Sequence, residues 1–497
     1  MPLHNHLSTL VIVLLLLVSV TANSHNYENQ YDPSLIQNIL DYGAVANTSS
    51  KDLDASRKNG KALYDAVQAA HSSKDAKTVL IPSDSSFAFM PYAPMVGLFN
   101  VTIVLDGSLT YYEGDMNDWT PSNFSQDPNR QVLDGIVIDQ SSHITLTSSS
   151  NSGGVVFGNG NRWWWSNIRH GTPRPNLMTI ANSLYVRMEY WHLHDSPRWT
   201  ANFYDVAHVL IQNCTIQVNI AAQRDMLAQH NLLSESTGLP TVPLNTDGFD
   251  IAGKNITIRH CHVENWDDAY CAKPLHQQSN LSTCTTDLLI EDSSITNGVG
   301  ASIGSVPPHK HVNCIANTTF RRITFSHPIK AIYVKPNPCP HGPAIDGTGI
   351  IHNITYEDIY ADKPLTWPIY VGTQQQKQPH GGADTGCDFF YPLPRTHCPT
   401  YGCVPVTRLQ LRNVFMERAL WAPGLLRCNE TGPCTGWEFT NVTIQSESTF
   451  PSRTRNFLCH ALQDYKFTNV SVGCQEEEVE HKATIADETL TAPMTVN

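Results

Sequence analysis

Eight segments of the chain share one four-position pattern of mostly apolar residues. The positions stand at offsets 0, 2, 5 and 7, so each pair two apart lies on one face of a strand, and the step of three allows a bend. The starts are separated by 47, 32, 30, 36, 55, 28 and 28 residues, which indicates a unit of about 30 residues with insertions in three turns. The matches are Val209/Ile211/Cys214/Ile216, Ile256/Ile258/Cys261/Val263, Leu288/Ile290/Ser293/Ile295, Thr318/Phe320/Ile323/Phe325, Ile354/Tyr356/Ile359/Ala361, Leu409/Leu411/Val414/Met416, Trp437/Phe439/Val442/Ile444 and Tyr465/Phe467/Val470/Val472.

A repeat of this length, with alternating inward residues and Asn-rich bends, predicts an all-β solenoid of short strands stacked turn on turn. It lacks the leucine and asparagine spacing of a leucine-rich repeat, and a propeller would need four strands per blade. Residues 23–497 are therefore expected to form a single domain. Ser56 to Ser73 has the helical spacing of apolar residues and predicts one amphipathic helix, which would cap the open first turn.

The N-terminal segment has the pattern of a secretory signal. An apolar run from Leu10 to Val20 ends in small residues, and the first charged residue is Glu28. The run is shorter than the roughly 20 residues that span a membrane. We predict a signal peptide over 1–22 and a secreted, extracellular mature chain with no membrane partner after cleavage; an uncleaved anchor is the alternative.

The charge balance narrows the choice of partner. Lys and Arg number 32 against 45 Asp and Glu, a net charge of −13, and no basic cluster occurs. This argues against nucleic acid or an anionic membrane surface as the main partner. Hydrophobic residues make up 41% of the chain, which excludes disorder for most of it. We expect a monomer.

Cysteine usage agrees with the secretory route. All 13 cysteines follow the predicted signal, so disulfides are expected, with one cysteine left over. Eleven Asn-x-Ser/Thr sequons, among them Asn47 and Asn429, predict a glycoprotein. His260, Cys261 and His262 are residue types that can bind a metal ion. Because neighbouring residues on a strand point to opposite faces, we expect no metal site there.

Polar residues gather between Asn245 and Lys335, where a purely structural solenoid does not require them. Asp247 precedes one repeat, and Asp267 and Asp268 precede the strand after it. Because stacked turns lie about 4.8 Å apart, these carboxyl groups are expected to meet in one groove. Carboxylates held together raise each other's pKa, so one can act as an acid while another acts as a base. Hydrolysis of a glycosidic bond with inversion uses such a pair, with roughly 6.5 to 9.5 Å left for a water.

Blander interpretations exist for these residues and others. Asp side chains at bends cap turns by accepting bonds from backbone amides, although the adjacent Asp267 and Asp268 repel each other in a way that a turn does not need. Residues 300–304 match the Gly-x-Ser-x-Gly pattern of esterases, but no helix follows, as that site requires. Trp163 to Trp165 could stack on a sugar, but a tryptophan cluster near a bend more commonly belongs to the core. Trp199 and Trp266 are better placed to line a groove.

The ordered motifs resemble family 28 of the glycoside hydrolases, the polygalacturonases and rhamnogalacturonases. They are "NTDGFD" from Asn245, "DD" at Asp267, "GVGASIGS" from Gly298, and "AIYVK" followed by "PNP". "DYGA" at Asp41, "GNGNRWWW" and "LHDSPRWT" follow in the family's order, so the resemblance covers nearly the whole mature chain. It implies a single-stranded right-handed parallel β-helix, in agreement with the repeat.

The resemblance also implies roles. Asp267 would be the general acid that protonates the leaving oxygen, and Asp247 and Asp268 would hold and deprotonate the attacking water. Lys335 matches the family's lysine, and we take Lys335, Tyr333, Trp266 and Asn245 as substrate-binding residues. A disulfide between Cys428 and Cys434 is implied as well, and no cofactor is.

Three departures from the family pattern bear on substrate. Val299 stands where polygalacturonases have histidine, Tyr333 where they have arginine, and Ala269 where a cysteine follows the acid pair. Loss of a guanidinium weakens two-point recognition of a carboxylate. Loss of the histidine is, within the family, a trait of rhamnogalacturonase-like members.

The expected function is therefore a secreted inverting glycosidase of the polygalacturonase type, whose partner is an acidic plant-type polysaccharide with α-1,4-galacturonosyl linkages. The alternatives are a rhamnogalacturonan hydrolase and a non-catalytic cell-wall carbohydrate-binding β-helix. Insertions at Asp225 to Val242 and Pro364 to Pro405 are expected to shape the ends of the groove, which leaves endo and exo attack both open.

Overall fold

The computed structural model describes residues 33–120, 132–150, 153–170, 172–221, 225, 243–276, 281, 284–375 and 385–477. The predicted signal peptide, most of the Asp225 to Val242 insertion, and the sequon at Asn123 lie outside these residues. No helix among the described residues is long and apolar enough to cross a membrane.

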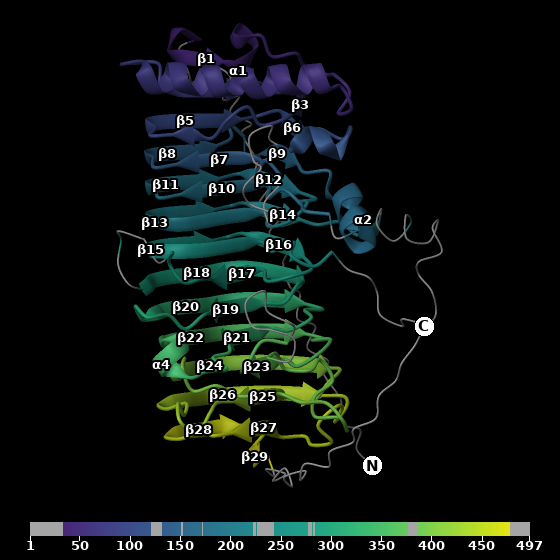
Figure 1. Cartoon of the computed structure of the whole chain (residues 1–497), viewed down its shortest axis with the longest axis vertical. Helices are drawn as coiled ribbons and strands as arrows, with labels where there is room; N and C mark the ends of the chain where they lie inside the picture. The colour runs from purple at the N-terminus through teal and green to yellow at the C-terminus, as the bar shows by residue number, and fades with distance from the viewer. Residues whose placement is uncertain are drawn as a thin grey trace, which may run out of the picture.

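The chain winds into a right-handed parallel β-helix, drawn with its axis vertical in Figure 1. Within the described residues, 29 strands form one continuous parallel network in which each coil pairs with its neighbouring coils. The pairings arrange the strands in three stacks that run along the axis. The predicted solenoid is confirmed.

The first stack carries the candidate site. It contains β4 (Met95–Val96), β7 (Ile136–Asp139), β10 (Met178–Ala181), the first parts of β13 (Ala201–Gln212) and β15 (Phe249–Arg259), β17 (Tyr270–Ala272), β19 (Ala301–Val306), β21 (Ile332–Pro336), β23 (Ile369–Val371), β25 (Gly424–Arg427), β27 (Phe457–His460) and β29 (Cys474–Glu476).

The second stack contains β1 (Ile36–Asn38), β2 (Thr78–Ile81), β5 (Phe99–Leu105), β8 (Ser142–Thr147), β11 (Leu184–Glu189), parts of β13 and β15, β18 (Cys284–Asn297), β20 (Asn313–Ser326), β22 (Gly349–Asp362), β24 (Val406–Ala419), β26 (Trp437–Ser446) and β28 (Tyr465–Val470). The third contains β3 (Ser86–Phe89), β6 (Ser108–Tyr111), β9 (Gly154–Phe157), β12 (Trp191–His194), β14 (Thr215–Gln217), β16 (His262–Asn265) and the ends of the long strands.

The step of three in the repeat is a corner between the second and third stacks. The residue before its third position has a left-handed backbone in each coil, as at Asn213, Asp358, Asn413, Asn441 and Asn469. Asparagine tolerates this conformation and can bond to its equivalent in the next coil. Asn469 Nδ2 donates to Asn441 Oδ1 at 2.9 Å, and Asn441 Nδ2 donates to Asn413 Oδ1 at 3.1 Å. The Asn-rich bends are thus a ladder that fixes the register of successive coils.

Helix α1 (Leu53–Ser72) covers the N-terminal end of the stack, as predicted (Figure 1). Asp52 caps it by accepting a bond from the backbone N–H of Ala55 at 3.0 Å. Leu63, Ala66 and Val67 are buried in the main core. The amphipathic face therefore closes the first coil, which would otherwise expose its apolar interior and strand edges.

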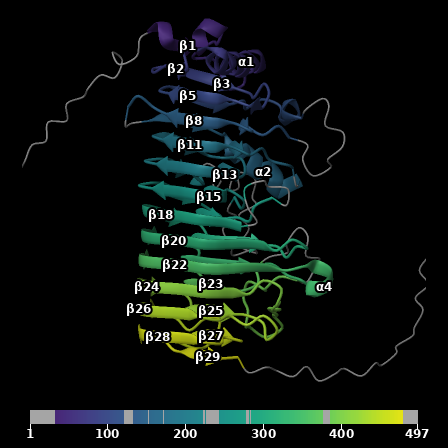
Figure 2. The ribbon, with the colours of Figure 1, turned by 90° about the vertical axis from the view of Figure 1, so that its left-hand side faces the viewer.

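The remaining helices are short or peripheral. Helix α2 (Gly160–His170) contains the tryptophan cluster, and Trp163 and Trp164 are each 1% exposed, which favours the core interpretation. Helices α2 and α4 (Pro343–Asp346) lie outside the stacked strands (Figure 2). Single-turn elements are η2 (Pro33–Leu35), η3 (Ile39–Tyr42) and η4 (Met116–Trp119).

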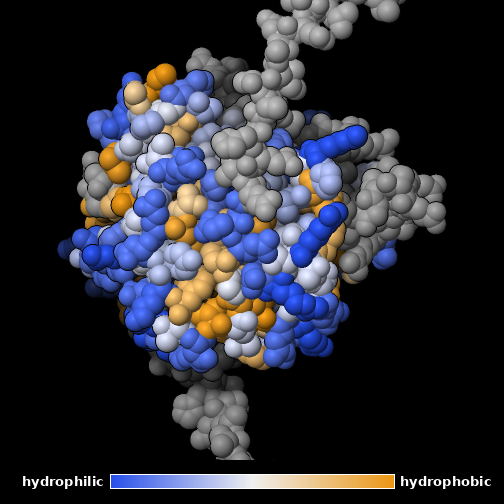
Figure 3. All heavy atoms as spheres, turned by 90° about the horizontal axis from the view of Figure 1, so that it is seen from below, coloured by the Kyte–Doolittle hydropathy of each residue, from blue (hydrophilic) through white to orange (hydrophobic). Residues whose placement is uncertain are grey.

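At the opposite end, the described residues form no capping helix. Figure 3 looks onto it and shows apolar surface between polar residues. Tyr465 in β28 is 41% exposed, and Phe467, Val470 and Val472 of the last repeat are only partly buried. The last coil thus presents residues of the same pattern that the preceding coils bury.

The disulfides lie in the second half of the chain. The pair Cys428–Cys434 is present, as implied, with Cys284–Cys314, Cys339–Cys403, Cys387–Cys398 and Cys459–Cys474. Cys214, Cys261 and Cys271 are free and buried, so three cysteines are left over instead of the expected one.

Candidate active site

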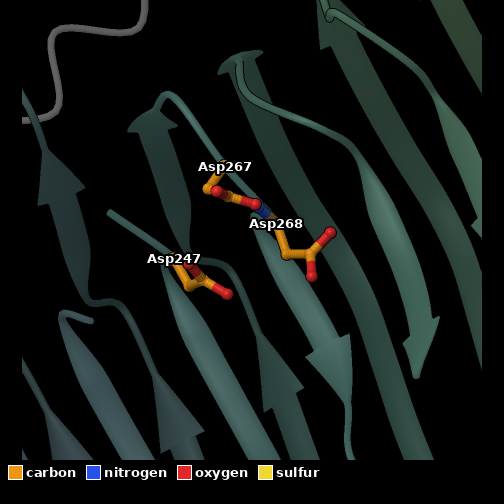
Figure 4. A group of neighbouring side chains, drawn as sticks. All are labelled: Asp247, Asp267 and Asp268. Atoms are coloured by element: carbon orange, nitrogen blue, oxygen red, sulfur yellow. The ribbon is translucent and has the colours of Figure 1, made fainter. Parts of the chain in front are cut away.

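Three carboxylates meet beside the first stack, on the side where its strands begin. Asp247 lies two residues before β15, and Asp267 and Asp268 lie between β16 and β17. Phe249 pairs with Tyr270, so Asp247 and Asp268 occupy the same position in successive coils. Figure 4 shows the three side chains close together, and one oxygen of each lies within 4.8 Å of the others. The predicted convergence of the trio therefore occurs, with Asp268 rather than Asp267 as the register partner of Asp247.

Asn265 holds the two carboxylate segments in place. Its Nδ2 donates to the backbone carbonyl of Thr246 at 3.0 Å and to that of Asp268 at 2.8 Å. A Cβ on Gly298, which has φ 63°, would lie 2.4 Å from Asn265 Oδ1. Glycine at this position therefore leaves room for the amide that joins the two coils.

Asp268 is held as a carboxylate. Its Oδ1 accepts a bond from Ser302 Oγ at 2.7 Å, and its Oδ2 faces Lys273 Nζ at 3.3 Å and pairs with Lys335 Nζ. Burial favours the neutral form, but the two ammonium groups outweigh it. The pKa of Asp268 consequently lies well below its usual range.

Asp247 and Asp267 behave in the opposite way. Burial, followed by the charge of Asp267, raises the pKa of Asp247 well above its ordinary value. Burial, followed by the charge of Asp268, raises the pKa of Asp267. Close carboxyl groups disfavour each other's ionisation, so this pair binds a proton more readily than Asp268 does. Burial also raises the pKa of the neighbouring Asp250 to about 6.

The oxygens of the pair differ in their partners. Asp267 Oδ2 accepts a bond from the backbone N–H of Asn245 at 2.8 Å, and its Oδ1 accepts one from that of Asp268 at 2.9 Å. Asp247 Oδ1 is buried and has no hydrogen-bond partner among the described residues. A buried acceptor of this kind is suited to hold a water. The site thus combines two carboxyl groups with raised pKa values, a carboxylate held by two lysines, and a buried oxygen that lacks a partner among the described residues.

The separation of the carboxyl groups is shorter than the spacing expected for inversion. The trio lies within 4.8 Å, whereas inverting pairs typically stand roughly 6.5 to 9.5 Å apart. Distance alone therefore does not support inversion, and the stereochemical outcome stays a prediction.

The comparisons with known proteins decide the family. The family model described as "Glycosyl hydrolases family 28" matches residues 101–461. The chain belongs to this family. Endopolygalacturonase I of Aspergillus aculeatus is 25% identical over 306 residues, which cover 61% of this chain and 67% of that protein. A polygalacturonase of Juniperus ashei is 23% identical over 440 residues, which cover 84% of this chain and 70% of that protein.

Solved structures support the same fold. An endo-xylogalacturonan hydrolase from Aspergillus tubingensis has a TM-score of 0.61 at 18% identity and covers 89% of this chain and 99% of that chain. An exopolygalacturonase from Thermotoga maritima has a TM-score of 0.54 at 14% identity and covers 89% and 92%. These proteins share the β-helix, and this family 28 chain is a glycoside hydrolase by membership.

Two of the four predicted substrate residues lie beside the trio. Lys335 is buried and pairs with Asp268. Asn245 is exposed and has a left-handed backbone; its N–H bonds to Asp267, and its Oδ1 accepts a bond from Arg174 Nη2 at 3.0 Å. Both residues therefore position the carboxylates, whatever contact they make with a sugar.

The other two are enclosed by protein. Tyr333 is 4% exposed, and its hydroxyl accepts a bond from the backbone N–H of Gln375 at 3.0 Å. Trp266 is 9% exposed, and its Nε1 donates to the carbonyl of Val218 at 3.3 Å. Their small exposed fractions leave little ring surface for stacking on a sugar.

A second apolar cluster explains the burial of Tyr333. It lies outside the main core and includes Val299, which stands at the histidine position of polygalacturonases. The described part of the Pro364 to Pro405 insertion packs onto it with Trp367, Tyr370 and the Cys387–Cys398 disulfide. The insertion therefore covers the side chains of Val299 and Tyr333.

Several polar residues of the site were not predicted. Lys273 contacts Asp247, Asp250 and Asp268 at 3.6, 3.3 and 3.3 Å. Lys273 directly follows β17. The strand register places it opposite Gly304 in the next coil, and Gly304 opposite Lys335 in the coil after that. Aligning the coils by register would have revealed this lysine pair, but the repeat template covers only the other two stacks. Ser302, the serine of the esterase-like pattern, donates to Asp268 instead of facing a base.

Proposed function

We propose that this protein hydrolyses α-1,4-galacturonosyl linkages of pectic polysaccharide, as a secreted monomeric enzyme of the polygalacturonase type. The observation that carries the proposal is the convergence of three carboxylates with different partners. Burial and mutual charge raise the pKa values of Asp247 and Asp267, whereas two lysines hold the pKa of Asp268 below its usual range. General acid and base in one groove are what glycoside hydrolysis requires.

In this mechanism Asp267 gives its proton to the glycosidic oxygen as the bond to the anomeric carbon breaks. A water held at Asp247 Oδ1 attacks that carbon and passes its proton to Asp247, and the two carboxyl groups then exchange the proton. Asp268 stays ionised and stabilises positive charge that develops on the sugar ring. The raised pKa of both exchanging groups suits each to its role near operating pH.

An acidic sugar fits the electrostatics of the groove. The chain as a whole is negative, but Lys273, Lys335 and Arg174 stand around the trio. Burial, followed by the charge of Arg198, lowers the pKa of Arg174 to about 10. These cations offset the carboxylates and reduce the repulsion that a uronate would otherwise meet.

The test is product analysis on three polymers: polygalacturonan, rhamnogalacturonan and xylogalacturonan. Wild type is expected to release reducing sugar from polygalacturonan, and Asp247→Asn, which removes the base but keeps the shape, is expected to release almost none. Equal release by both proteins would contradict the assignment of the trio. Chain-length analysis of the products then separates end-on from internal attack.

A second candidate rests on Val299 and Tyr333, which replace the family's histidine and arginine. Preferential cleavage of rhamnogalacturonan would favour that substrate class. Binding of these polymers without cleavage of any of them would favour a non-catalytic cell-wall β-helix.

A further inference from the structure

Lys330 is a buried lysine that has no anionic partner among the described residues. It lies between β20 and β21 and is 4% exposed. Among the described residues no hydrogen bond or ion pair involves its ammonium group, which instead lies over the rings of Tyr333, Tyr370 and Phe389, at 5.0, 5.8 and 5.9 Å from the ring centroids. Burying an ammonium without a counter-charge is unfavourable, and aromatic faces offset only part of that cost.

The register places Lys330 in line with the catalytic carboxylates. Tyr270 pairs with Ala301, and Ala301 pairs with Ile332, so the positions two residues before these are Asp268, Val299 and Lys330. Two coil spacings separate Lys330 from Asp268, or about 10 Å along the axis. Groups that act on the reacting atoms lie about 3 Å from them, so Lys330 is placed to contact a neighbouring part of the sugar chain.

The groups around Lys330 also point to an anion. Burial and the nearby ammonium of Lys335 lower the pKa of Lys330 to about 7, while the charges of Asp268 and Asp267 act in the opposite direction. Tyr333 and Tyr370 are buried, and their pKa values are raised well above the ordinary value, so both are neutral. An incoming carboxylate would supply the missing counter-charge.

We propose that Lys330, enclosed by Tyr333, Tyr370 and Phe389, binds the carboxylate of a uronic acid residue next to the bond that is cleaved. This inference rests on the proposed function, because it concerns the same groove. It also assigns a cation to a chain in which Tyr333 replaces the family's arginine: the tyrosine ring forms a wall of the cage, and the charge comes from a lysine three residues earlier.

The experiment measures binding and turnover with Lys330→Met. Methionine keeps the length of the side chain and removes the charge, and Lys254→Met, at an exposed lysine in β15, is the matched control. Binding of trigalacturonate and of its methyl ester is measured by calorimetry, with thermal melting to confirm that each variant is folded. Lys330→Met is expected to lose roughly ten- to a hundredfold in affinity for the acid and little for the ester, since a charge-assisted bond is removed. Lys254→Met is expected to match wild type.

The pH profile adds an independent readout. A lysine must be protonated to bind a carboxylate, so the ratio of wild-type to variant affinity is expected to fall as pH rises from 6 to 9. Taking the ratio removes the titration of Asp247, Asp250 and Asp267, which both proteins share.

The outcomes separate the two proposals. Equal affinity of wild type and Lys330→Met for the acid, or an equal loss for acid and ester, overturns the role of Lys330, while cleavage of polygalacturonan by wild type still supports the function. If wild type neither binds trigalacturonate nor cleaves polygalacturonan, the proposed function fails and the inference fails with it.

Discussion

Replacing Asp267 by asparagine tests the division of roles most directly. The amide keeps the size of the side chain but cannot give a proton to the leaving oxygen. General acid catalysis typically contributes 10² to 10⁴ in rate, so kcat is expected to fall by that factor, which corresponds to roughly 3 to 5 kcal/mol of barrier. KM should change little, because the amide occupies the same space as the carboxyl group.

Stability should respond much less than rate. The carboxylate of Asp267 accepts bonds from the N–H groups of Asn245 and Asp268, and an amide can accept only one of them. The lost bond costs about 1 to 3 kcal/mol. The raised pKa of Asp267 means that its surroundings favour a neutral group, and this offsets part of the loss. The melting temperature is therefore expected to stay close to that of wild type.

The assay compares reducing sugar released from polygalacturonan with hydrolysis of an activated aryl galacturonide. A leaving group that needs no proton should be cleaved almost as fast by Asp267→Asn as by wild type. Asp75→Asn, at an exposed position after α1, serves as the control. A loss of the same size on both substrates, or a loss below tenfold on the polymer, would refute Asp267 as the acid.

Two further variants follow from the same contacts, and a last prediction concerns the stereochemistry of the reaction. Lys335→Met should lower kcat and shift the alkaline limb of the kcat–pH profile to higher pH, because Lys335 lowers the pKa of Asp267. The variant should also be less stable than wild type by about 3 kcal/mol at neutral pH. This difference should shrink in acid, because Lys335 stabilises Asp268 only while that carboxyl group is ionised. Ser302→Ala should retain most glycosidase activity but melt at a lower temperature than wild type. If Ser302 were an esterase nucleophile, the variant would lose all activity. Proton NMR of the first product should show inverted anomeric configuration; retention would make one carboxylate a covalent nucleophile.

The fold could be predicted because its signal is local and repeated. Residues of the template such as Ile211, Ile258, Ile290 and Phe320 all lie in the interior, and their spacing is visible without any knowledge of the turns between them. The same template also contained Cys214 and Cys261 at inward positions. Both are free and stacked, and the N–H of Cys214 donates to Cys261 Sγ at 3.4 Å. The template did not distinguish them from Cys284 and Cys314, which are also partners in neighbouring coils but form a disulfide.

The contacts of the site were harder to predict, because they depend on register and on insertions. Pairing of Asp247 with Asp268 follows from the match of Phe249 to Tyr270, which the spacing of the repeat does not specify. Burial of Tyr333 depends on the Pro364 to Pro405 insertion, which folds back onto the first stack. Periodicity identifies which residues face outward, but it does not show which outward face another segment will cover.

The regular coil spacing offers a way for one edge of the β-helix to carry acidic groups and still bind the acidic sugars that we propose as its substrate. Equivalent positions recur about every 4.8 Å, so a substitution in one coil sets the charge at one step along the groove. In this chain the steps read Asp247, Asp268, Val299 and Lys330, and the sign of the charge reverses over three coils. In the proposed mechanism the carboxylates supply the acid and base where the bond is cleaved, and the uncharged position at Val299 separates them from Lys330. A uronate polymer lying along this edge would meet repulsion only at the step where its sugar ring acquires positive charge.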